Sequence, residues 1–135
     1  MERTLVLIKP DAVERNLIGR ILSFYEKGNL KIVALKMEEI TKELAEAHYY
    51  EHKDKDYYYE LIEFIKRSPL CALVLEGYNA IERTREINGA TNPEKQKEGT
   101  IRKSFALSTR ENCVHASDSK ENAKREINLW FPELK

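Results

Sequence analysis

An uninterrupted apolar run, LCALVL at residues 70–75, places the strongest constraint on how this chain can fold. The run is far shorter than the roughly 20 apolar residues that a membrane-spanning helix needs. It also lacks the polar alternation of a strand with one face in water, and is typical of a strand covered on both faces. We therefore expect residues 70–75 to form a central strand of a sheet.

Other segments have the periodicities of strands and helices that would complete such a fold. Residues 3–8 are an apolar β-type run, and residues 30–37 show partial two-residue alternation, so both predict strands. Apolar residues at helical spacing predict helices elsewhere. These helices are expected from Val13 to Gly28, over 41–52, over 57–66, and from Ala123 to Phe131.

Two helix starts are indicated by residues of the capping-box type. Asn79 is followed three positions later by Glu82, before a short helix that Gly89 would end. Asp118 and Glu121 have the same spacing before the last helix. We therefore expect both helices to begin with a side-chain cap.

The stretch from residue 89 to about residue 104 has no sustained period, which predicts a long polar loop. Residues 105–107 and 112–115 have β-type composition and could add strands. The order of elements predicts an α+β fold, a ferredoxin-like β-α-β-β-α-β sandwich with a four-stranded antiparallel sheet, additional helices and a long loop. The length suits one core, so we expect a single domain over residues 1–135.

The charge balance argues against a strong field over the whole surface. Lysine plus arginine total 23 and aspartate plus glutamate total 23, so any basic site must be local. The start of the chain lacks the pattern of an export signal, and we expect a cytoplasmic protein. Cys71 and Cys113 lie in apolar runs without a metal-binding spacing, so we expect reduced packing residues.

Well-known phosphate-binding motifs are missing from the sequence. There is no GxxxxGK[ST] loop, no protein-kinase signature and no GxGxxG arrangement among the five glycines. If the chain handles phosphate, it must do so with another arrangement of residues.

Among the three histidines, His115 has the most unusual setting. It lies in NCVHASDS, residues 112–119, where β-type residues give way to small polar ones at an expected strand-to-helix junction. His48 and His52 are four apart, a spacing that could place two imidazoles on one helix face as metal ligands. Because no HExxH glutamate or nearby cysteine accompanies them, we favour a helix face with partly exposed rings.

Basic residues gather around the long loop, and Lys9 ends the first expected strand. This grouping indicates a local anion site, although a solvated basic loop would have the same composition. Tyr57 and Tyr58 open an expected helix, where one of them could stack on a nucleobase; a pair of core and rim residues is the alternative. The basic residues near the loop are Arg83, Arg85, Arg102, Lys103 and Arg110.

At these residues the sequence resembles the nucleoside diphosphate kinase family, from Arg3 to Phe131. The stretches that carry the resemblance are ERTLVLIKPDAVERNLIGRIL (2–22), LKIVALKM (30–37), AHYYEHKDKDYYYELIEFI (47–65), SPLCALVLEG (68–77), INGATNP (87–93), GTIR (99–102) and NCVHASDS (112–119). Their order and spacing make the resemblance specific. It implies ping-pong transfer of the terminal phosphate of a nucleoside triphosphate, usually ATP, to a nucleoside diphosphate, with broad base specificity and a role in maintaining triphosphate pools.

Carried over by position, the resemblance implies a catalytic group at the expected strand-to-helix junction. His115 falls on the histidine that accepts the phosphate, and Glu126 on the glutamate that orients its ring through the other ring nitrogen. Ser117 matches a serine beside the site.

The resemblance also implies nucleotide-binding roles. Lys9 would reach the phosphates and the sugar 3′-hydroxyl, and Asn112 would bind the ribose. Tyr57 would stack on the base, with Thr109 on the far side. The phosphate chain would be contacted by Tyr49, Arg85, Thr91 and Arg102.

Magnesium would be held through the nucleotide phosphates, without a metal site on the protein. The resemblance further implies a homo-oligomer, commonly a tetramer or hexamer, with nucleoside tri- and diphosphates as partners and no membrane or nucleic acid required.

The sequence departs from the family pattern near the expected nucleotide entrance. RKSF at 102–105 stands in place of RGDF, and REN at 110–112 in place of GRN. Thr109 occupies a usually aliphatic position, Tyr57 replaces a commoner phenylalanine, and Ala116 a commoner glycine. We expect these changes to affect base preference, affinity and oligomer contacts more than the reaction.

Two functions from other classes are compatible with the expected fold. A nucleic-acid-binding module could share this architecture, but it would carry an aromatic RNP1-like strand that the apolar runs lack. A nucleotide-sensing module would bind nucleotides without transferring phosphate.

Overall fold

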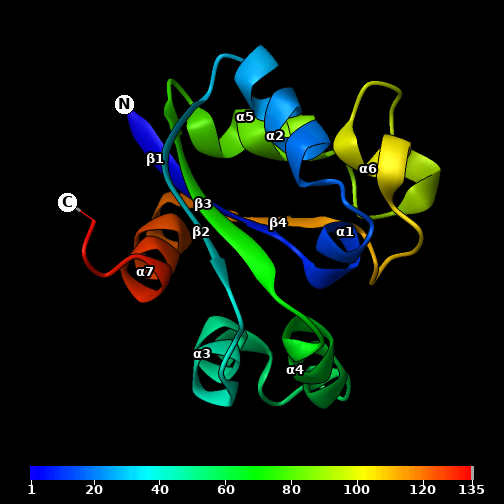
Figure 1. The fold of residues 1–135 in the computed structure, drawn as a ribbon, viewed down its shortest axis with the longest axis vertical. Helices are drawn as coiled ribbons and strands as arrows, with labels where there is room; N and C mark the ends of the chain where they lie inside the picture. Colours follow the sequence, from blue (N-terminus) through cyan, green and yellow to red (C-terminus); the bar gives the residue numbers. More distant parts are fainter. Residues whose placement is uncertain (135) are drawn as a thin grey trace.

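The computed structural model describes residues 1–134, and its centre is a four-stranded sheet (Figure 1). The strands lie in the order β2-β3-β1-β4, and each neighbouring pair is antiparallel. Their bounds are Glu2–Ile8 for β1, Lys31–Glu38 for β2, Leu70–Gly77 for β3 and Val114–Ala116 for β4. The predicted α+β class and ferredoxin-like strand order are confirmed.

The apolar run at 70–75 is a central strand, as predicted. Strand β3 pairs with β1 on one side and β2 on the other, and all its residues except Glu76 are buried. Strand β1 continues the same buried layer and pairs with β4, where Leu7 lies opposite His115.

Helices cover both faces of the sheet (Figure 1). One face packs against α2 and α5, and the other against α3, α4 and α7. The helices are α1 Pro10–Glu14, α2 Ile18–Lys27, α3 Lys42–His48, α4 Tyr58–Lys66, α5 Ala80–Asn88, α6 Ile101–Phe105 and α7 Lys120–Trp130, with 3-10 turns η1 Tyr50–His52 and η2 Pro93–Lys95.

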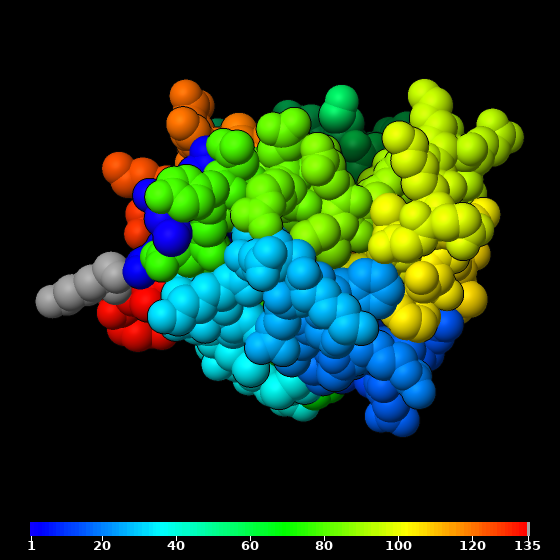
Figure 2. Space-filling view, turned by 90° about the horizontal axis from the view of Figure 1, so that it is seen from above, coloured from blue at the N-terminus to red at the C-terminus, as the bar shows by residue number. Residues whose placement is uncertain are grey.

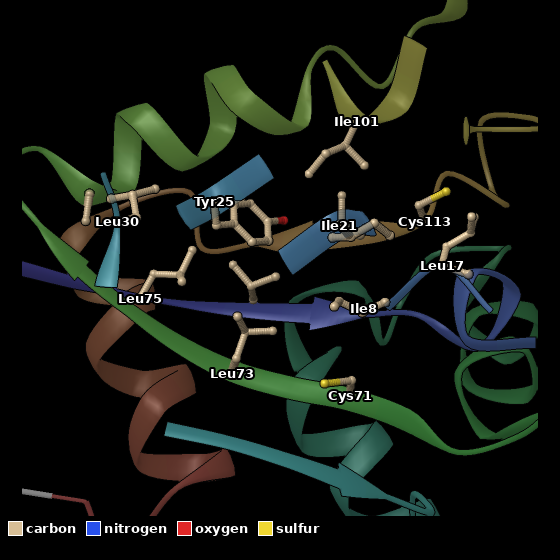
Figure 3. Close-up of a cluster of buried hydrophobic side chains, with 14 residues drawn as sticks. Ile8, Leu17, Ile21, Tyr25, Leu30, Cys71, Leu73, Leu75, Ile101 and Cys113 are labelled. Atoms are coloured by element: carbon tan, nitrogen blue, oxygen red, sulfur yellow. The ribbon is translucent and has the colours of Figure 1, made fainter. Parts of the chain in front are cut away.

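The face under α2 and α5 contains a hydrophobic cluster that runs from Leu30 at one end to Cys113 at the other (Figure 3). Tyr25 lies in this cluster, and its hydroxyl donates a 2.6 Å hydrogen bond to Oδ1 of Asn88. Figure 2 looks onto this layer, where α2 and α5 lie side by side and the segment around α6 forms one end. The cluster therefore packs the layer formed by α2 and α5 onto the strands of the sheet.

Two predicted helices and the predicted long loop differ in the structure. The helix expected from Val13 to Gly28 is two helices, because Asn16 adopts a left-handed conformation with φ of 59° between α1 and α2. The helix expected over 41–52 ends at His48, and a 3-10 turn follows. Part of the expected loop is the short helix α6, so the prediction of a strand at 105–107 is wrong; Phe105 instead packs edge-on against Phe24.

The two predicted side-chain caps are also wrong. Asn79 has a φ of 50° and makes no cap hydrogen bond, and the carboxylate of Glu2 accepts the N–H of Ile81 instead. At the start of α7 the cap is Ser119, whose hydroxyl accepts the N–H of Asn122 at 3.1 Å.

Both cysteines are free and buried, as expected for packing residues. Burial raises the pKa of each thiol to about 11, so both stay protonated at neutral pH. Over residues 1–134, no helix has the length and apolar character needed to cross a membrane.

Candidate active site

A large cleft opens where the end of β1 lies beside the start of β4, and most of the predicted site residues line it. Its walls come from elements far apart in the sequence: the end of β1, the end of α3, helices α5, α6 and α7, the loop around residue 91, and β4. The predicted residues that line the cleft are Lys9, Tyr49, Arg85, Thr91, Arg102, Asn112, His115 and Glu126.

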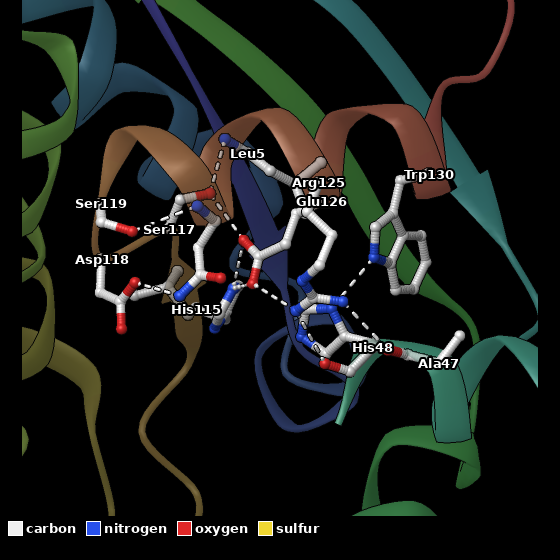
Figure 4. Close-up of polar contacts among 12 residues, drawn as sticks. Leu5, Ala47, His48, His115, Ser117, Asp118, Ser119, Arg125, Glu126 and Trp130 are labelled. Atoms are coloured by element: carbon white, nitrogen blue, oxygen red, sulfur yellow. Dashed lines mark hydrogen bonds and ion pairs between the residues drawn. The ribbon is translucent and has the colours of Figure 1, made fainter. Parts of the chain in front are cut away.

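His115 is held by a carboxylate on α7 (Figure 4). Its Nε2 lies 3.1 Å and 3.2 Å from the two carboxylate oxygens of Glu126. An ionised carboxylate only accepts hydrogen bonds, so Nε2 must donate and therefore carries the ring proton. In the neutral ring the lone pair is then on Nδ1, which is the nitrogen able to act as a nucleophile.

Glu126 is itself fixed by neighbouring groups. The hydroxyl of Ser117 donates to Oε1 of Glu126 at 2.6 Å and accepts the N–H of Leu5 at 3.2 Å. Burial alone would raise the pKa of the Glu126 carboxyl, but hydrogen bonds from His115 and Ser117 and the nearby charge of Arg125 hold it below its usual range. Ser117 is thus placed behind Glu126, outside the cleft lining.

His48 is a site residue that the sequence did not reveal. Its ring is buried and packs edge-on against His115, with ring centroids 4.6 Å apart. Trp130 Nε1 donates to Nδ1 of His48 at 3.1 Å, so the proton of the neutral ring lies on Nε2. Burial and then the charge of His115 hold the pKa of His48 well below its usual value, which keeps the ring neutral.

The prediction that the ring of His48 is partly exposed is therefore wrong. His52 lies in η1 at the mouth of the cleft, with Nδ1 3.1 Å from the hydroxyl of Tyr57. The available signal for His48 was its position on α3, three residues after buried Ala45 and on the same face. That spacing places a histidine in an apolar stripe, where burial is the natural outcome.

A strained turn separates Asn112 from His115. Cys113 has a φ of 75°, and the N–H of Val114 donates to the carbonyl of Asn112 at 2.9 Å. This combination defines a γ-turn of the rare positive-φ type. For a residue with a side chain, such a conformation costs on the order of 1–3 kcal/mol and persists only where surrounding contacts hold it.

Lys9 lies half-buried on the cleft wall next to this turn. Its ammonium group donates to Oδ1 of Asn112 at 2.9 Å. Loss of water around the group lowers the pKa of Lys9 to about 8, and the charges of Arg102 and Arg110 act in the same direction, against the opposing charge of Asp11. The protonated form still predominates at neutral pH.

Arg102 connects the loop to β4. Its guanidinium donates to the carbonyls of Gly89 at 2.8 Å, Val114 at 2.7 Å and, more weakly, Asn112 at 3.4 Å. Three of the five N–H donors of this side chain are thus committed to the backbone. Arg102 also lines the cleft and brings its positive charge to that wall.

The two residues predicted to contact the base do not line the cleft. Tyr57 precedes α4 at the protein surface, where its hydroxyl lies near His52. Thr109 is exposed in the segment between α6 and β4, and its carbonyl accepts the side-chain N–H of Asn112 at 2.8 Å. Most of the residues predicted to bind the phosphates therefore line one cleft, while the two predicted to contact the base lie outside it.

Comparison with known proteins gives one consistent match. The family model described as nucleoside diphosphate kinase matches residues 2–135. The chain is 62% identical over 134 residues to the nucleoside diphosphate kinase of Clostridium perfringens, covering 99% of this chain and 94% of the relative. It is 56% identical over 133 residues to that of Pyrococcus abyssi, covering 96% and 84%.

The solved structures to which this chain is similar belong to the same family as these relatives. The Aquifex aeolicus nucleoside diphosphate kinase superimposes with a TM-score of 0.93 and 43% identity, covering 96% of this chain and 94% of that one. A nucleoside diphosphate kinase family protein from Babesia bovis gives a TM-score of 0.94 and 45% identity, covering 98% and 90%.

Proposed function

Because this chain belongs to the nucleoside diphosphate kinase family, we propose that it carries the transferred phosphoryl group on Nδ1 of His115. Its activity is that of a nucleoside diphosphate kinase, which moves the terminal phosphate of a nucleoside triphosphate to a nucleoside diphosphate. The observation that carries the proposal is the hydrogen bond of His115 Nε2 with Glu126, which leaves Nδ1 as the nucleophile.

In the first half-reaction, Nδ1 of His115 attacks the terminal phosphorus. The N–P bond forms while the bond from phosphorus to the bridging oxygen breaks, and the diphosphate leaves with that electron pair. The ring keeps its Nε2 proton and becomes cationic, so the buried carboxylate of Glu126 compensates the new charge. In the second half-reaction a terminal oxygen of the acceptor diphosphate attacks the same phosphorus, and the ring is released as the neutral base.

Cationic side chains would bind the phosphates during both steps. Phosphoryl transfer spreads negative charge over the equatorial oxygens, so fixed positive donors favour the transition state. Lys9 and Arg102 supply such charges on one wall, and Arg85 on α5 faces the same cleft. We assign Tyr49 and Thr91 to the phosphate chain and Asn112 to the ribose, on the basis that all three line the cleft.

The base would lie toward the mouth of the cleft, between the regions of Tyr57 and Thr109. Neither residue lines the cleft, so their stacking role requires the nucleotide to extend outward past His52. Stacking discriminates weakly between bases, which supports broad base specificity.

Magnesium would enter with the nucleotide. Within residues 1–134, the one cluster of three possible metal ligands is His48, His115 and Glu126. The lone pair on His48 Nδ1 accepts from Trp130, and Glu126 accepts from His115 and Ser117, so this cluster is a poor match for a hard cation that prefers oxygen ligands. The phosphates themselves would hold the ion, which would neutralise part of their charge.

We further propose a single-domain enzyme that acts in the cytoplasm as a homo-oligomer, a tetramer or a hexamer, without a membrane or nucleic-acid partner. Strand β2 supports self-association because it is an edge strand that exposes Leu35 and Met37. An edge strand that exposes apolar residues is a template for pairing with another chain.

A labelling experiment tests the proposal. The protein is incubated with γ-labelled ATP, separated from nucleotide, and then given GDP. We expect acid-labile label on the protein that is chased into GTP, and loss of both steps in His115→Ala. Normal turnover by His115→Ala would refute the proposed route.

A further inference from the structure

Asp11 is a buried acidic residue that the proposed reaction does not yet use. It lies on α1, just after the end of β1, and only 1% of it is exposed. Its Oδ2 accepts the N–H of Cys113 at 3.1 Å, across more than a hundred residues of sequence. Its Oδ1 is buried without a hydrogen-bond partner in the described part of the chain.

The hydrogen bond from Cys113 ends on the strained γ-turn. Because φ of Cys113 is 75°, the turn needs external contacts to hold it. Three residues supply those contacts. The Asp11 carboxylate accepts the N–H of Cys113, and the backbone N–H of Lys9 donates to the carbonyl of Cys113 at 2.8 Å. The guanidinium of Arg102 donates to the carbonyl of Val114. Asp11 is the contact on the turn's central N–H.

The turn sets the directions of the two groups on either side of it. Asn112 precedes Cys113 and accepts from Lys9, and His115 follows two residues later on β4. Reacting groups that are misplaced by about 1 Å can lose about 100-fold in rate. A change in the backbone at Cys113 would therefore move both sides of the site together.

Resting on the proposed function, we propose that Asp11 is a positioning residue for phosphoryl transfer. Its carboxylate holds the Cys113 turn, and through the turn it aligns His115 with the Lys9–Asn112 pair. Asp11 contacts neither nucleotide nor the transferred group in this arrangement, and acts through the backbone that presents them.

The charge of Asp11 adds a second, separable effect. Lys9 is faced by Arg102 from α6 and by Arg110 from the following segment, and Asp11 provides the opposing negative charge. The thiol of Cys113 also lies nearby, and the ring of Phe64 lies 6.0 Å from the Lys9 ammonium. Removal of the negative charge should make Lys9 lose its proton at lower pH.

Two substitutions at Asp11 separate these effects. Asp11→Asn keeps an oxygen that can accept the N–H of Cys113 but removes the charge. In the Asp11→Asn protein, His115 should be phosphorylated at a rate close to that of the wild type near pH 6.5. The decline of this rate at high pH should begin about one pH unit lower than in the wild type. Asp11→Ala removes both the hydrogen-bond acceptor and the charge. The rate of His115 phosphorylation in this variant should fall by about 10- to 100-fold at every pH.

A glycine at position 113 provides the rescue. Glycine adopts a φ of 75° without the strain of a side chain, so the turn in Cys113→Gly should depend less on Asp11. In the Cys113→Gly background, Asp11→Ala should therefore lower the single-turnover rate by a much smaller factor than in the wild type. Leu30→Ala is the control for general destabilisation, because Leu30 lies at the opposite end of the same hydrophobic cluster (Figure 3).

The measurement is single-turnover phosphorylation by γ-labelled ATP, with the fraction of folded protein determined for each variant. Wild-type rates and pH profiles in Asp11→Ala would overturn the proposal. It would also be overturned if Leu30→Ala reproduced the loss per folded molecule, or if the Cys113→Gly background left the effect of Asp11→Ala unchanged. If His115→Ala still forms the labelled intermediate, the proposed function fails instead, and the experiment tells the two failures apart.

Discussion

At the scale of single residues, the proton positions around His115 follow from a chain of hydrogen bonds. Trp130 donates to Nδ1 of His48 and so places the proton of that ring on Nε2, while the ring packs edge-on against His115. Glu126 accepts from His115 on one side and from Ser117 on the other. The hydrogen bond with Glu126 therefore leaves the lone pair of the neutral His115 ring on Nδ1.

Substitution of Glu126 tests this selection. Glu126→Gln removes the negative charge that would compensate the cationic phosphorylated ring, so we expect the rate of His115 phosphorylation to fall by about 10-fold or more. The rate is measured in a single turnover with labelled ATP. Glu121→Gln, on the exposed first turn of the same helix, is the control. Equal rates for Glu126→Gln and wild type would show that the charge is unimportant.

The pKa of Lys9 leads to a pH dependence. Burial lowers this pKa to about 8, so the ammonium is charged below that pH and is lost above it. We expect kcat/KM, which reports groups in the free enzyme, to decline above about pH 8. The same decline should be absent in Lys9→Met, whose kcat/KM is low throughout. A wild-type kcat/KM that stays constant to about pH 10 would contradict the assignment of Lys9.

At the scale of elements, α7 is the support on which the site depends, because it carries Glu126 and ends at Trp130. Its start is fixed by Ser119, whose hydroxyl accepts the N–H of Asn122. Loss of such a cap usually costs about 1 kcal/mol.

We therefore expect Ser119→Ala to lower the free energy of unfolding by about 1 kcal/mol in urea denaturation. Ser23→Ala, inside α2, should leave it unchanged or slightly raise it, because alanine is the better helix former. A Ser119→Ala protein as stable as the wild type would mean that another group satisfies the N–H of Asn122.

The strands were predictable from sequence because burial on a sheet imposes a local pattern. The run at 70–75 is typical of a strand covered on both faces, and it is one. The caps were not predictable, because they depend on distant partners: Glu2 supplies the acceptor for α5 across 79 residues. Asn79 has the composition of a cap, but its left-handed backbone makes no cap hydrogen bond.

In the site, too, some features could be predicted from the sequence and others depend on distant partners. The resemblance placed His115 and Glu126 in the chain, and the fold brings them within 3.1 Å. The local spacing on α3 indicated a buried His48, but its contacts with Trp130, 82 residues away, and with His115 became visible only in the fold. Asp11 was missed for a similar reason, since its hydrogen bond with Cys113 becomes visible only when β1 and β4 are paired.

At the scale of the whole molecule, a single sheet separates two hydrophobic clusters, and both cysteines lie in the cluster on the face that α2 and α5 cover. Cys71 is 2% exposed and Cys113 is fully buried. Burial raises the pKa of both thiols to about 11, so the reactive thiolate is scarce and inaccessible in the folded protein.

Native protein treated with iodoacetamide near neutral pH should therefore take up label only as fast as it opens. Protein unfolded in urea should gain label on both cysteines, which serves as the control for reagent activity. Mass spectrometry counts the labels. Rapid labelling of folded protein would show that the covering layers are looser than the structure indicates.

The phosphoryl group is proposed to be carried on one particular nitrogen of His115. The phosphorylated protein, labelled with ¹⁵N in histidine, is examined by NMR for coupling between phosphorus and the ring nitrogens. We expect phosphorus on Nδ1 of His115, with the proton retained on Nε2 toward Glu126. Phosphorus on Nε2, or on any other residue, would refute the proposed route.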